Sequence, residues 1–370
     1  MLRQNWVTVD LQAIRHNYHL LADPLPEGVR VMAVVKADAY GHGSVAVAKA
    51  LLAEGAGALA VALPEEGITL REAGVTAPIL VLGAAMPLAA EAAIEQYLTQ
   101  TVFEPSTLAL LEETAKRMGK TAMVHIKLDT GMGRIGLRTE AEAQALADAL
   151  KDAPHVRVTG VYTHFSDADA PLEGGEMNEY TRAQLERFKV LRAFFPADIP
   201  SHVSNSAMSL LYPEARFQMV REGIALYGYP PIPTHLPFQP ALSWQTEVVH
   251  IKDVEAGSAI SYNRTYVADG PRRVATIAVG YGDGYHRALS NRGYVLIGGK
   301  RCAILGRVCM DQTMVDVSDV PQARVGDAAV LIGRQGDALI GADEVAGWAG
   351  TISYEVLLAI TARVPRKTIG

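Results

Sequence analysis

Strand-like and helix-like segments alternate between residues 31 and 222, and this alternation restricts the fold more than any other feature of the sequence. The strand-like segments are short apolar runs, rich in β-branched residues, as is typical of buried parallel strands. We predict eight of them, at 31–36, 58–63, 78–82, 99–103, 124–129, 156–163, 201–204 and 218–222. Ala-, Leu- and Glu-rich segments predict helices at 44–54, 64–73, 87–96, 105–118, 139–151 and 178–194. Eight strands separated by helices over roughly 200 residues indicate a (β/α)8 TIM barrel, with a doubly wound open sheet as the main alternative.

The positions of the polar residues favour the barrel. In a barrel the carboxyl ends of all eight strands converge on one face, where the active site lies. Six polar side chains stand at or just after the ends of predicted strands: Lys36, Asp129, Arg134, His164, Ser206 and Arg221.

The pattern of predicted elements changes near residue 230. Five prolines between 230 and 240 predict a stiff, extended connection. Short alternating strands separated by Gly and Asp follow, at 241–251, 273–279, 293–297, 301–305, 313–317 and 328–332. We therefore predict a barrel domain over residues 1–235 and a mostly antiparallel β domain over 236–370. The strand-like residues 1–10 precede the barrel series, and a family resemblance carried by the motifs below implies that they pair with the second domain.

Composition excludes several classes of function. The net charge of −6 and the lack of a basic run argue against a nucleic-acid partner. No run approaches the ~18 apolar residues of a membrane span, and the first residues contain no apolar signal core. We expect a cytoplasmic protein, in which Cys302 and Cys309 are buried thiols rather than a disulfide.

Residues 31–43 carry the most informative motif, VMAVVKADAYGHG. Lys36 is the only charge in an apolar strand, and partial burial there lowers the pKa of its amine, as a Schiff-base lysine requires. A lysine that merely starts a solvated loop is the alternative. With the following Tyr40, Gly41, His42 and Gly43, the segment resembles the cofactor-lysine motif of the alanine racemases, pyridoxal-phosphate enzymes with a barrel fold.

A second segment, HIKLDTGMGRIG at 125–136, resembles another signature of this family. The resemblance implies that Arg134 orients the substrate carboxylate and the phenolic oxygen of the cofactor, and that Lys127 is a candidate for carbamylation. The pattern G-x-G-x-x-G at 131–136 also permits a dinucleotide-binding interpretation. That fingerprint belongs on the first strand of a fold and leads directly into a helix, which argues against it here.

The segment 163–169, THFSDAD, places one histidine and two aspartates close together. No partner histidines recur at ligand spacing, so we predict no metal and a buried, hydrogen-bonded His164. In the family this histidine lies near the catalytic tyrosine and the arginine that faces the cofactor ring.

The loops after the seventh and eighth predicted strands match the recurring phosphate site of barrels. The resemblance places Arg221 at the pyridine nitrogen, where a permanently charged donor leaves that nitrogen unprotonated and disfavours transamination. The expected cofactor-binding residues are Lys36, Tyr40, Arg134, His164, Asn205, Ser206, Arg221, Gly223, Ile224 and Tyr354.

Two segments of the second domain complete the resemblance. AISYNRTY at 259–266 matches the segment of the family's second base, which falls on Tyr262, although Asn263 stands where glycine is common. VCMDQ at 308–312 places Met310 at the substrate carboxylate. The resemblance also implies a substrate access corridor formed by Asp169, Tyr281, Arg287, Arg307 and Ile352.

Together these motifs imply an alanine racemase that uses pyridoxal 5'-phosphate and supplies D-alanine for peptidoglycan or catabolises it. Lys36 and Tyr262 would be the two bases, and a homodimer would share its active sites between subunits. A racemase that also accepts serine is one alternative. A barrel-type amino-acid decarboxylase is another, but that family has a glutamate where this chain has Arg221. A non-catalytic pyridoxal-phosphate carrier is the third, and the second domain with Tyr262 argues against it.

Overall fold

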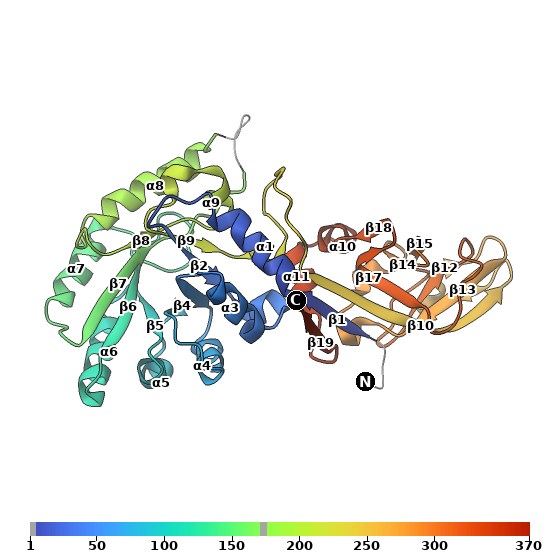
Figure 1. The fold of residues 1–370 in the computed structure, drawn as a ribbon, viewed down its shortest axis with the longest axis horizontal. Coiled ribbons are helices and arrows are strands. Elements are labelled where there is room, and N and C mark those ends of the chain that lie inside the picture. The colour runs from blue at the N-terminus through green and yellow to red at the C-terminus, as the bar shows by residue number, and fades with distance from the viewer. Residues whose placement is uncertain (1–4, 171–175) are drawn as a thin grey trace. The chain divides into compact units, whose positions relative to one another are not determined.

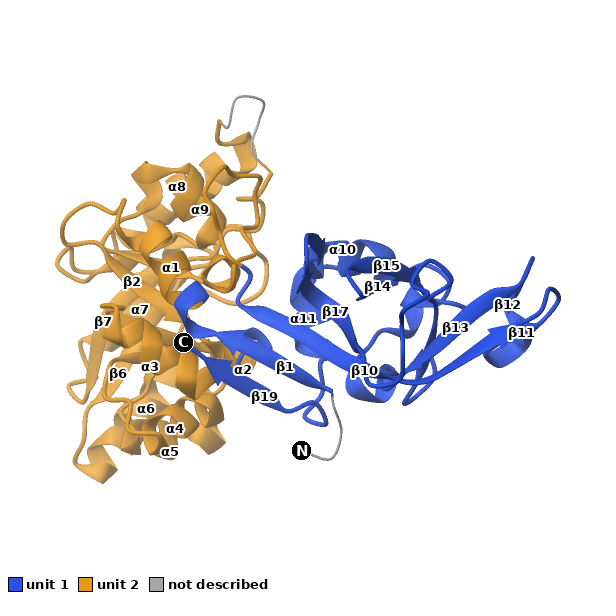
Figure 2. Cartoon of the chain, turned by 45° about the vertical axis from the view of Figure 1, so that its right-hand side comes forward, with its two compact units in different colours: residues 1–13, 40–42, 240–370 blue, residues 14–39, 43–239 orange. Residues whose placement is uncertain are grey.

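A computed structural model describes residues 5–170 and 176–370. Within these residues the chain divides into two compact units, coloured separately in Figure 2. The barrel unit comprises residues 14–39 and 43–239. The β unit comprises the residues up to 13, residues 40–42 and residues 240–370. Residues 40–42 therefore belong to the β unit although both of their flanking segments belong to the barrel.

The barrel unit is built on an eight-stranded, fully parallel sheet, seen in Figure 1. The order of its strands is β8-β7-β6-β5-β4-β3-β2-β9. Their bounds are β2 Arg30–Val34, β3 Ala58–Val61, β4 Ile79–Ala84, β5 Thr99–Val102, β6 Ala122–Lys127, β7 Val156–Tyr162, β8 Ser201–His202 and β9 Met219–Glu222.

The two ends of this sheet meet. The Gln218 amide donates to the Ser201 carbonyl at 3.3 Å, and the Arg221 amide donates to the Ser204 carbonyl at 3.0 Å. The sheet is thus a nearly closed eight-stranded barrel, which confirms the predicted fold class and rules out the open sheet.

Helices connect and flank the strands (Figure 1). Their bounds are α1 Leu11–Ala22, α3 Ser44–Ala53, α4 Pro64–Glu72, α5 Ala90–Glu95, α6 Pro105–Met118, α7 Glu140–Leu150, α8 Glu179–Arg192 and α9 Ser206–Leu211. Local chemistry explains their ends: Thr139 caps α7 by accepting from the Glu142 amide at 3.2 Å, and Gly119 ends α6 with a φ of 62°. The predicted helix 87–96 is instead a 3-10 turn, Pro87–Ala89, followed by α5. No helix within the described ranges is long and apolar enough to cross a membrane.

A large apolar cluster of the barrel unit lies where helices α6, α7 and α8 cover strands β6 and β7. Leu111, Val124, Ile126, Val161 and Phe188 are all fully buried there. Burying each such side chain stabilises the fold by about 1.5–3 kcal/mol. The packed strands are therefore a rigid scaffold for the polar residues at their carboxyl ends.

The β unit contains a nine-stranded sheet and a small hairpin. The sheet has the path β15-β14-β17-β10-β1-β19, and all its pairings are antiparallel except that of β1 with β19. The elements are β1 Trp6–Asp10, β10 Leu242–Val254, β11 Ala259–Ile260, β12 Tyr266–Val267, β13 Arg272–Ile277, β14 Tyr294–Ile297, β15 Lys300–Ala303, β16 Thr313–Asp316, β17 Ala328–Gln335, β18 Ala338–Ile340, β19 Arg366–Ile369, α10 Ala342–Ala349 and α11 Ser353–Ala359. Strand β1 alternates buried Val7 and Val9 with half-exposed neighbours, and it pairs with β10 as part of this sheet.

Candidate functional site

Lys36 begins a turn with an uncommon backbone. The segment α2, Lys36–Gly41, has positive φ angles at Ala37 (50°), Asp38 (51°), Ala39 (54°), Tyr40 (53°) and Gly41 (82°). It is therefore a left-handed turn, which costs about 1–2 kcal/mol for each residue that has a Cβ. Strain of this kind persists only where the surroundings impose it, and it concentrates at functional sites.

Hydrogen bonds from the barrel unit hold the start of this turn. The Asp38 carboxylate accepts from the Ser44 amide at 2.7 Å, and the Ala39 amide donates to the Val35 carbonyl at 2.9 Å. The Glu66 carboxylate accepts from the Ala37 amide. These hydrogen bonds fix the path of the chain where it leaves β2. Lys36, the first residue of the turn, is therefore held at a defined position.

The environment of Lys36 favours its neutral amine. Burial lowers the pKa of its ammonium group, the Arg134 guanidinium lowers it further, and the Glu66 carboxylate partly opposes both. A neutral amine is the nucleophilic form that a covalent cofactor attachment needs.

The loop from Asp129 to Arg138 carries Arg134. One oxygen of the buried Asp129 carboxylate accepts from the amides of Gly131 (3.1 Å) and Gly133 (2.9 Å). Gly136 has a φ of 128°, and a Cβ there would lie 2.6 Å from the Asp129 amide nitrogen. The glycines therefore close a tight loop at the end of β6.

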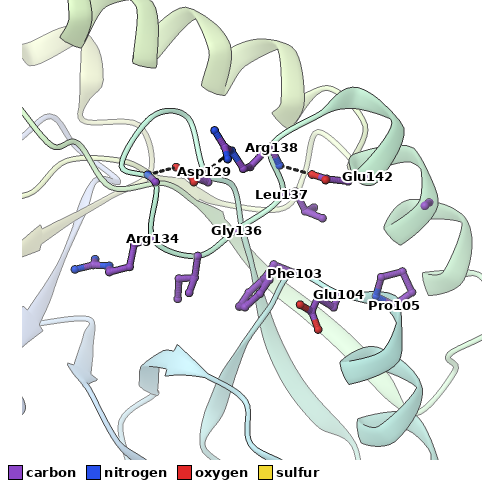
Figure 3. A pocket seen from close by; sticks show the side chains of 12 residues that line it. Phe103, Glu104, Pro105, Asp129, Arg134, Gly136, Leu137, Arg138 and Glu142 are labelled. Atoms are coloured by element: carbon purple, nitrogen blue, oxygen red, sulfur yellow. Dashed lines mark hydrogen bonds and ion pairs between the residues drawn. The ribbon is translucent and has the colours of Figure 1, made fainter.

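This loop explains why the G-x-G-x-x-G pattern is not a dinucleotide fingerprint. It follows the fifth strand of the barrel series, and α7 begins only after the cap at Thr139. Arg134 and Arg138 extend from the loop in different directions (Figure 3). A cavity of about 410 Å³ lies beneath the loop, lined by the loop residues together with Phe103 and Glu104 (Figure 3).

Lys127, at the end of β6, is a buried lysine with no hydrogen-bond partner among the described residues. Its Nζ lies 4.7 Å from the centre of the Tyr162 ring. Burial lowers its pKa well below the usual range, and the Arg221 and Arg134 guanidinium groups add to this, whereas Asp129 opposes it. The side chain is therefore a neutral amine that faces two cations.

Arg221 lies in β9 inside the barrel and is almost fully buried. Its Nη1 donates to the carbonyl (2.8 Å) and to Nδ1 (2.9 Å) of His202. Its Nη2 donates to the carbonyls of Thr163 (2.8 Å) and Val203 (3.0 Å) and lies 3.3 Å from Nδ1 of His164. All four Nη hydrogens are committed, whereas no described residue accepts from Nε.

Three histidines surround this guanidinium group, and their tautomers follow from it. Because Nδ1 of His202 accepts from Arg221, its Nε2 carries the hydrogen and donates to Nδ1 of His125 at 2.9 Å. Burial lowers the pKa of His125 to about 3, and burial together with the Arg221 charge lowers the pKa values of His164 and His202. All three rings are neutral.

Three residues of the site, His125, His202 and Tyr162, were not predicted from the sequence. Tyr162 stacks on His202 with ring centres 4.8 Å apart, and Gly160 leaves room for the His125 ring, which a Cβ would approach within 2.6 Å. His125 lies inside the motif at 125–136, and His202 lies at the end of a predicted strand, so their places in strands β6 and β8 were the available signal.

The loops after β8 and β9 lie together. The Gly223 amide donates to Oγ of Ser206 at 3.0 Å, and Ile224 begins the 3-10 turn η4, Ile224–Tyr227. The Asn205 side chain accepts from the Met208 amide at 3.0 Å and so caps α9. Ser206, Gly223 and Ile224 therefore form one cluster, and Asn205 fixes the start of the helix beside it.

The β unit gathers its predicted residues around the loop at 306–311. The Ser261 hydroxyl donates to the Arg307 carbonyl at 2.6 Å, which holds the turn η5, Tyr262–Arg264, against this loop. The Tyr281 amide donates to the Cys309 carbonyl at 3.0 Å, and the Gly282 amide donates to the Met310 carbonyl at 2.8 Å. Asn263 has a φ of 60°, the left-handed conformation that asparagine tolerates.

Arg287 joins the same cluster through Ser290, whose hydroxyl donates to the Arg287 carbonyl (2.6 Å) and accepts from the Val308 amide (3.0 Å). Tyr262 and Met310 are 67% and 53% exposed. Both cysteines are free, and burial raises the pKa of Cys302 to about 12.

Four predicted residues remain. Tyr40 and Tyr354 lie in the β unit with ring centres 6.0 Å apart, and burial raises the pKa of Tyr40. Ile352 is 61% exposed just before α11, and Asp169 is exposed in the barrel unit. Among residues 5–170 and 176–370 there is no group of three or more His, Cys, Asp or Glu side chains that could hold a metal.

Comparisons with known proteins agree across the whole chain. Residues 9–231 match the family model "Alanine racemase, N-terminal domain", and residues 241–368 match "Alanine racemase, C-terminal domain". The alanine racemase of Symbiobacterium thermophilum is 48% identical over 99% of this chain and 97% of its own length, and that of Halothermothrix orenii is 43% identical over the same shares.

Solved structures show the same similarity. Alanine racemase from Bacillus anthracis with bound L-Ala-P has a TM-score of 0.91 and 42% identity, covering 100% of this chain and 96% of that one. Alanine racemase from Bartonella henselae with covalently bound pyridoxal phosphate has a TM-score of 0.90 and 28% identity, covering 99% of both chains.

Proposed function

As a member of the alanine racemase family, the chain interconverts L-alanine and D-alanine with pyridoxal phosphate as its cofactor, and we propose that Lys36 and Tyr262 carry the two proton transfers. Full-length similarity to racemases sets aside the decarboxylase and the non-catalytic carrier. The observation that carries the assignment of residues is the partly buried amine of Lys36 at the end of β2, whose pKa is lowered by burial and by the Arg134 guanidinium.

The residues of the barrel unit fit the cofactor. Lys36 would hold it covalently, and Arg221 has one uncommitted donor, Nε–H, for the ring nitrogen. In the cluster of Ser206, Gly223 and Ile224, the Ser206 hydroxyl and the Ile224 amide would be neutral donors for the phosphate, and the Gly223 amide, which donates to Ser206, would hold that hydroxyl in place. We assign Tyr40, Tyr354, His164 and Asn205 to the same cofactor site by the resemblance.

When bound, pyridoxal phosphate supplies the conjugation that makes the Cα hydrogen of the substrate acidic. The protein must then place one base on each face of Cα. Lys36 would exchange the proton of D-alanine, and Tyr262 would exchange the proton of L-alanine. Arg134 and the Met310 backbone would hold the substrate carboxylate, which keeps Cα between the two bases.

Arg221 would keep the chemistry on the racemisation path. Burial lowers the pKa of Arg221 only to about 10, so the guanidinium group is charged at neutral pH and can only donate. A donor at the pyridine nitrogen excludes a proton there. The neutral His202 and His125 rings behind it supply no proton either.

Lys127 would be carbamylated. Its neutral amine can attack carbon dioxide, forming an N–C bond and releasing one proton, and the resulting anion would pair with Arg134 and Arg221. Incubation with ¹³C-labelled bicarbonate should give one protected carbamate signal in the NMR spectrum. Lys127→Ala should abolish that signal, whereas Lys116→Ala, at an exposed lysine of α6, should retain it.

The active sites would be shared between two subunits of a homodimer. Tyr262, on the turn η5, and Met310, on the loop 306–311 to which Ser261 joins that turn, are exposed side chains of the β unit, which suits residues that complete the site of a second chain. Asp169, Tyr281, Arg287, Arg307 and Ile352 would line the substrate access corridor.

Proton exchange in deuterium oxide tests the assignment of the two bases. Tyr262→Phe should lose racemisation yet still exchange the Cα hydrogen of D-alanine, because Lys36 remains. L-alanine should not exchange. Tyr294→Phe, at another exposed tyrosine of the β unit, should behave as the wild type. Equal exchange of both enantiomers by Tyr262→Phe would remove Tyr262 from the mechanism.

A further inference from the structure

Glu222, the last residue of β9, is a carboxyl group that the racemase chemistry leaves unexplained. Its side chain is fully buried, and neither carboxyl oxygen makes a hydrogen bond of acceptable geometry with a described residue. An ionised carboxylate without partners is costly in such a place, so acidic residues are rarely buried in this way.

The strand geometry places Glu222 behind the phosphate cluster. Consecutive strand residues point to opposite faces, and Arg221 points into the barrel, so Glu222 points outward to α9, which packs on β9. Ser206 and Ser209, three residues apart on α9, lie near enough to its carboxyl group for their hydroxyls to lower its pKa. Glu222 is thus adjacent to the Ser206 hydroxyl that accepts from the Gly223 amide.

Among residues 5–170 and 176–370, no side chain forms an ion pair with Glu222. The Arg216 guanidinium is committed to backbone carbonyls, donating to that of Ser209 at 2.9 and 3.0 Å and to that of Pro24 at 3.3 Å. Arg221 is committed on the opposite face of the strand. Burial raises the pKa of Glu222, and the two hydroxyls, Arg216 and Arg221 only partly oppose this. Burial thus favours the neutral carboxylic acid, which has one O–H donor.

We propose that Glu222 is a positioning residue, a protonated acid that directs the Ser206 hydroxyl toward the cofactor phosphate. The proposal rests on the assignment of Ser206 as a phosphate ligand under the proposed function. It adds a residue that touches neither substrate nor cofactor and acts through its neighbour.

The hydrogen-bond inventory of Ser206 explains the effect. Its oxygen has two lone pairs and one hydrogen, and one lone pair is used by the Gly223 amide. When the Glu222 O–H donates to the second lone pair, the Ser206 hydrogen is left for a phosphate oxygen, in a chain of mutually polarised hydrogen bonds. An ionised Glu222 would instead accept that hydrogen and would place a negative charge behind a phosphate of about −1.5 to −2.

The protonation of Glu222 determines whether the affinity for pyridoxal phosphate rises or falls with pH. A bound phosphate raises the pKa of Glu222 further, so protonation of Glu222 and cofactor binding favour each other. The affinity for pyridoxal phosphate should therefore fall as the pH rises through the pKa of Glu222. The amide of Glu222→Gln is a hydrogen-bond donor that does not titrate. The affinity of this variant for pyridoxal phosphate should therefore equal that of the wild type at low pH and should not fall as the pH rises.

Equilibrium titration of the apoprotein tests the proposal with pyridoxal phosphate and with pyridoxal, which lacks the phosphate. Glu222→Leu removes the donor and should weaken pyridoxal phosphate about fivefold while leaving pyridoxal unchanged. Glu214→Gln removes an exposed carboxylate nearby and is the matched control for long-range charge. The infrared spectrum of the wild type at neutral pH should contain the carbonyl stretch of a protonated carboxylic acid, which Glu222→Gln abolishes.

Two results would overturn the proposal: tighter binding of pyridoxal phosphate by Glu222→Gln at neutral pH, or absence of the infrared band. Either would mean that Glu222 is ionised. Ser206→Ala tests the phosphate site separately and should weaken pyridoxal phosphate but not pyridoxal. If it does not, Ser206 is no phosphate ligand and the role of Glu222 is lost with it, whereas the infrared band still reports the state of Glu222.

Discussion

The buried Arg221 side chain has two roles: it joins the ends of neighbouring strands, and it keeps one N–H donor for a ligand. Its Nη atoms join the carbonyl ends of β7 and β8 through Thr163, His202 and Val203, and its Nε–H remains for a ligand. Its position is thus set by backbone groups rather than by a carboxylate. A carboxylate partner would have made the guanidinium a weaker donor, and none is needed because the cation stays charged even when buried.

Substitution of Arg221 should therefore affect stability and reaction path together. Arg221→Glu should leave three buried carbonyls without donors and lower the free energy of unfolding by about 3–5 kcal/mol. In the folded fraction, the ring nitrogen would gain a proton, which should slow racemisation and raise the share of transamination. Pyruvate formed per racemisation event measures this share. An unaltered ratio would mean that Arg221 does not face the ring.

The three neutral histidines should make the barrel sensitive to acid. Their folded-state pKa values lie below the ordinary 6.5, so the unfolded chain binds more protons beneath that pH. Their stabilisation is complete above pH 6.5 and is lost as the pH falls, by up to about 1.4 kcal/mol per pH unit for each histidine. Denaturant titrations of the apoprotein between pH 7 and 5 measure the slope.

One variant tests whether this slope comes from the buried rings. His125→Gln should reduce the slope by roughly one third, because one of three titrating groups is removed. His235→Gln, at an exposed histidine, should leave it unchanged. A wild-type stability that does not vary over this range would contradict the assignment of neutral rings.

For single residues, the sequence predicts the environment of a motif residue better than it predicts contacts between residues far apart in the chain. The apolar run before Lys36 predicted a depressed pKa, and the structure confirms this. The buried state of Glu222 had no signal, because acidic residues are usually exposed and only the packing of α9 on β9 covers this one. The hydrogen bond between His125 and His202 joins two strands far apart in sequence, so no local pattern could predict it.

Among the elements, the barrel strands were predictable and the turn α2 was not. The eight apolar runs agree with the strands because periodicity reports burial. A left-handed turn over Ala37, Asp38, Ala39 and Tyr40 contradicts the intrinsic preference of those residues, so tertiary contacts must impose it. Strands β18 and β19 are short and were missed for a similar reason, since their pairing with β17 and β1 defines them.

Gly41, which ends this turn, and Gly43, which lies just beyond it, offer a matched test of its strain. A Cβ at Gly41 would lie 2.9 Å from the Leu357 carbonyl oxygen, whereas a Cβ at Gly43 would meet no atom within 4 Å, although both residues have positive φ. Gly43→Ala should lower the free energy of unfolding by about 1 kcal/mol, and Gly41→Ala by at least about twice that. Chemical denaturation measures both. Equal losses would mean that the Leu357 contact is easily relaxed.

For the whole molecule, the main clue to assembly is the exposure of side chains that we propose to belong to the active site and its access corridor. Tyr262, Met310 and Ile352 are each more than half exposed in the β unit. A large exposed side chain that also has a functional role suggests an interface, because catalysis requires exclusion of water. In a twofold dimer, each subunit would cover the exposed residues of its partner's β unit in the same way. Both active sites would then be equivalent.

Mixed dimers test this assembly directly. Lys36→Ala and Tyr262→Phe should each be inactive alone. In a mixed dimer that shares its sites, one site lacks both groups and the other has both intact. Random exchange gives about half mixed dimers with half their sites working, so roughly 25% of wild-type activity should return.

The matched control mixes Lys36→Ala with the double variant Lys36→Ala/Tyr262→Phe, which can form no intact site and should stay inactive under either arrangement. Subunit exchange is followed independently with an affinity tag on one partner. If Lys36 and Tyr262 of one chain served the same site, every site in the first mixture would lack one base. Exchange without recovery of activity would then show that each chain completes its own active site.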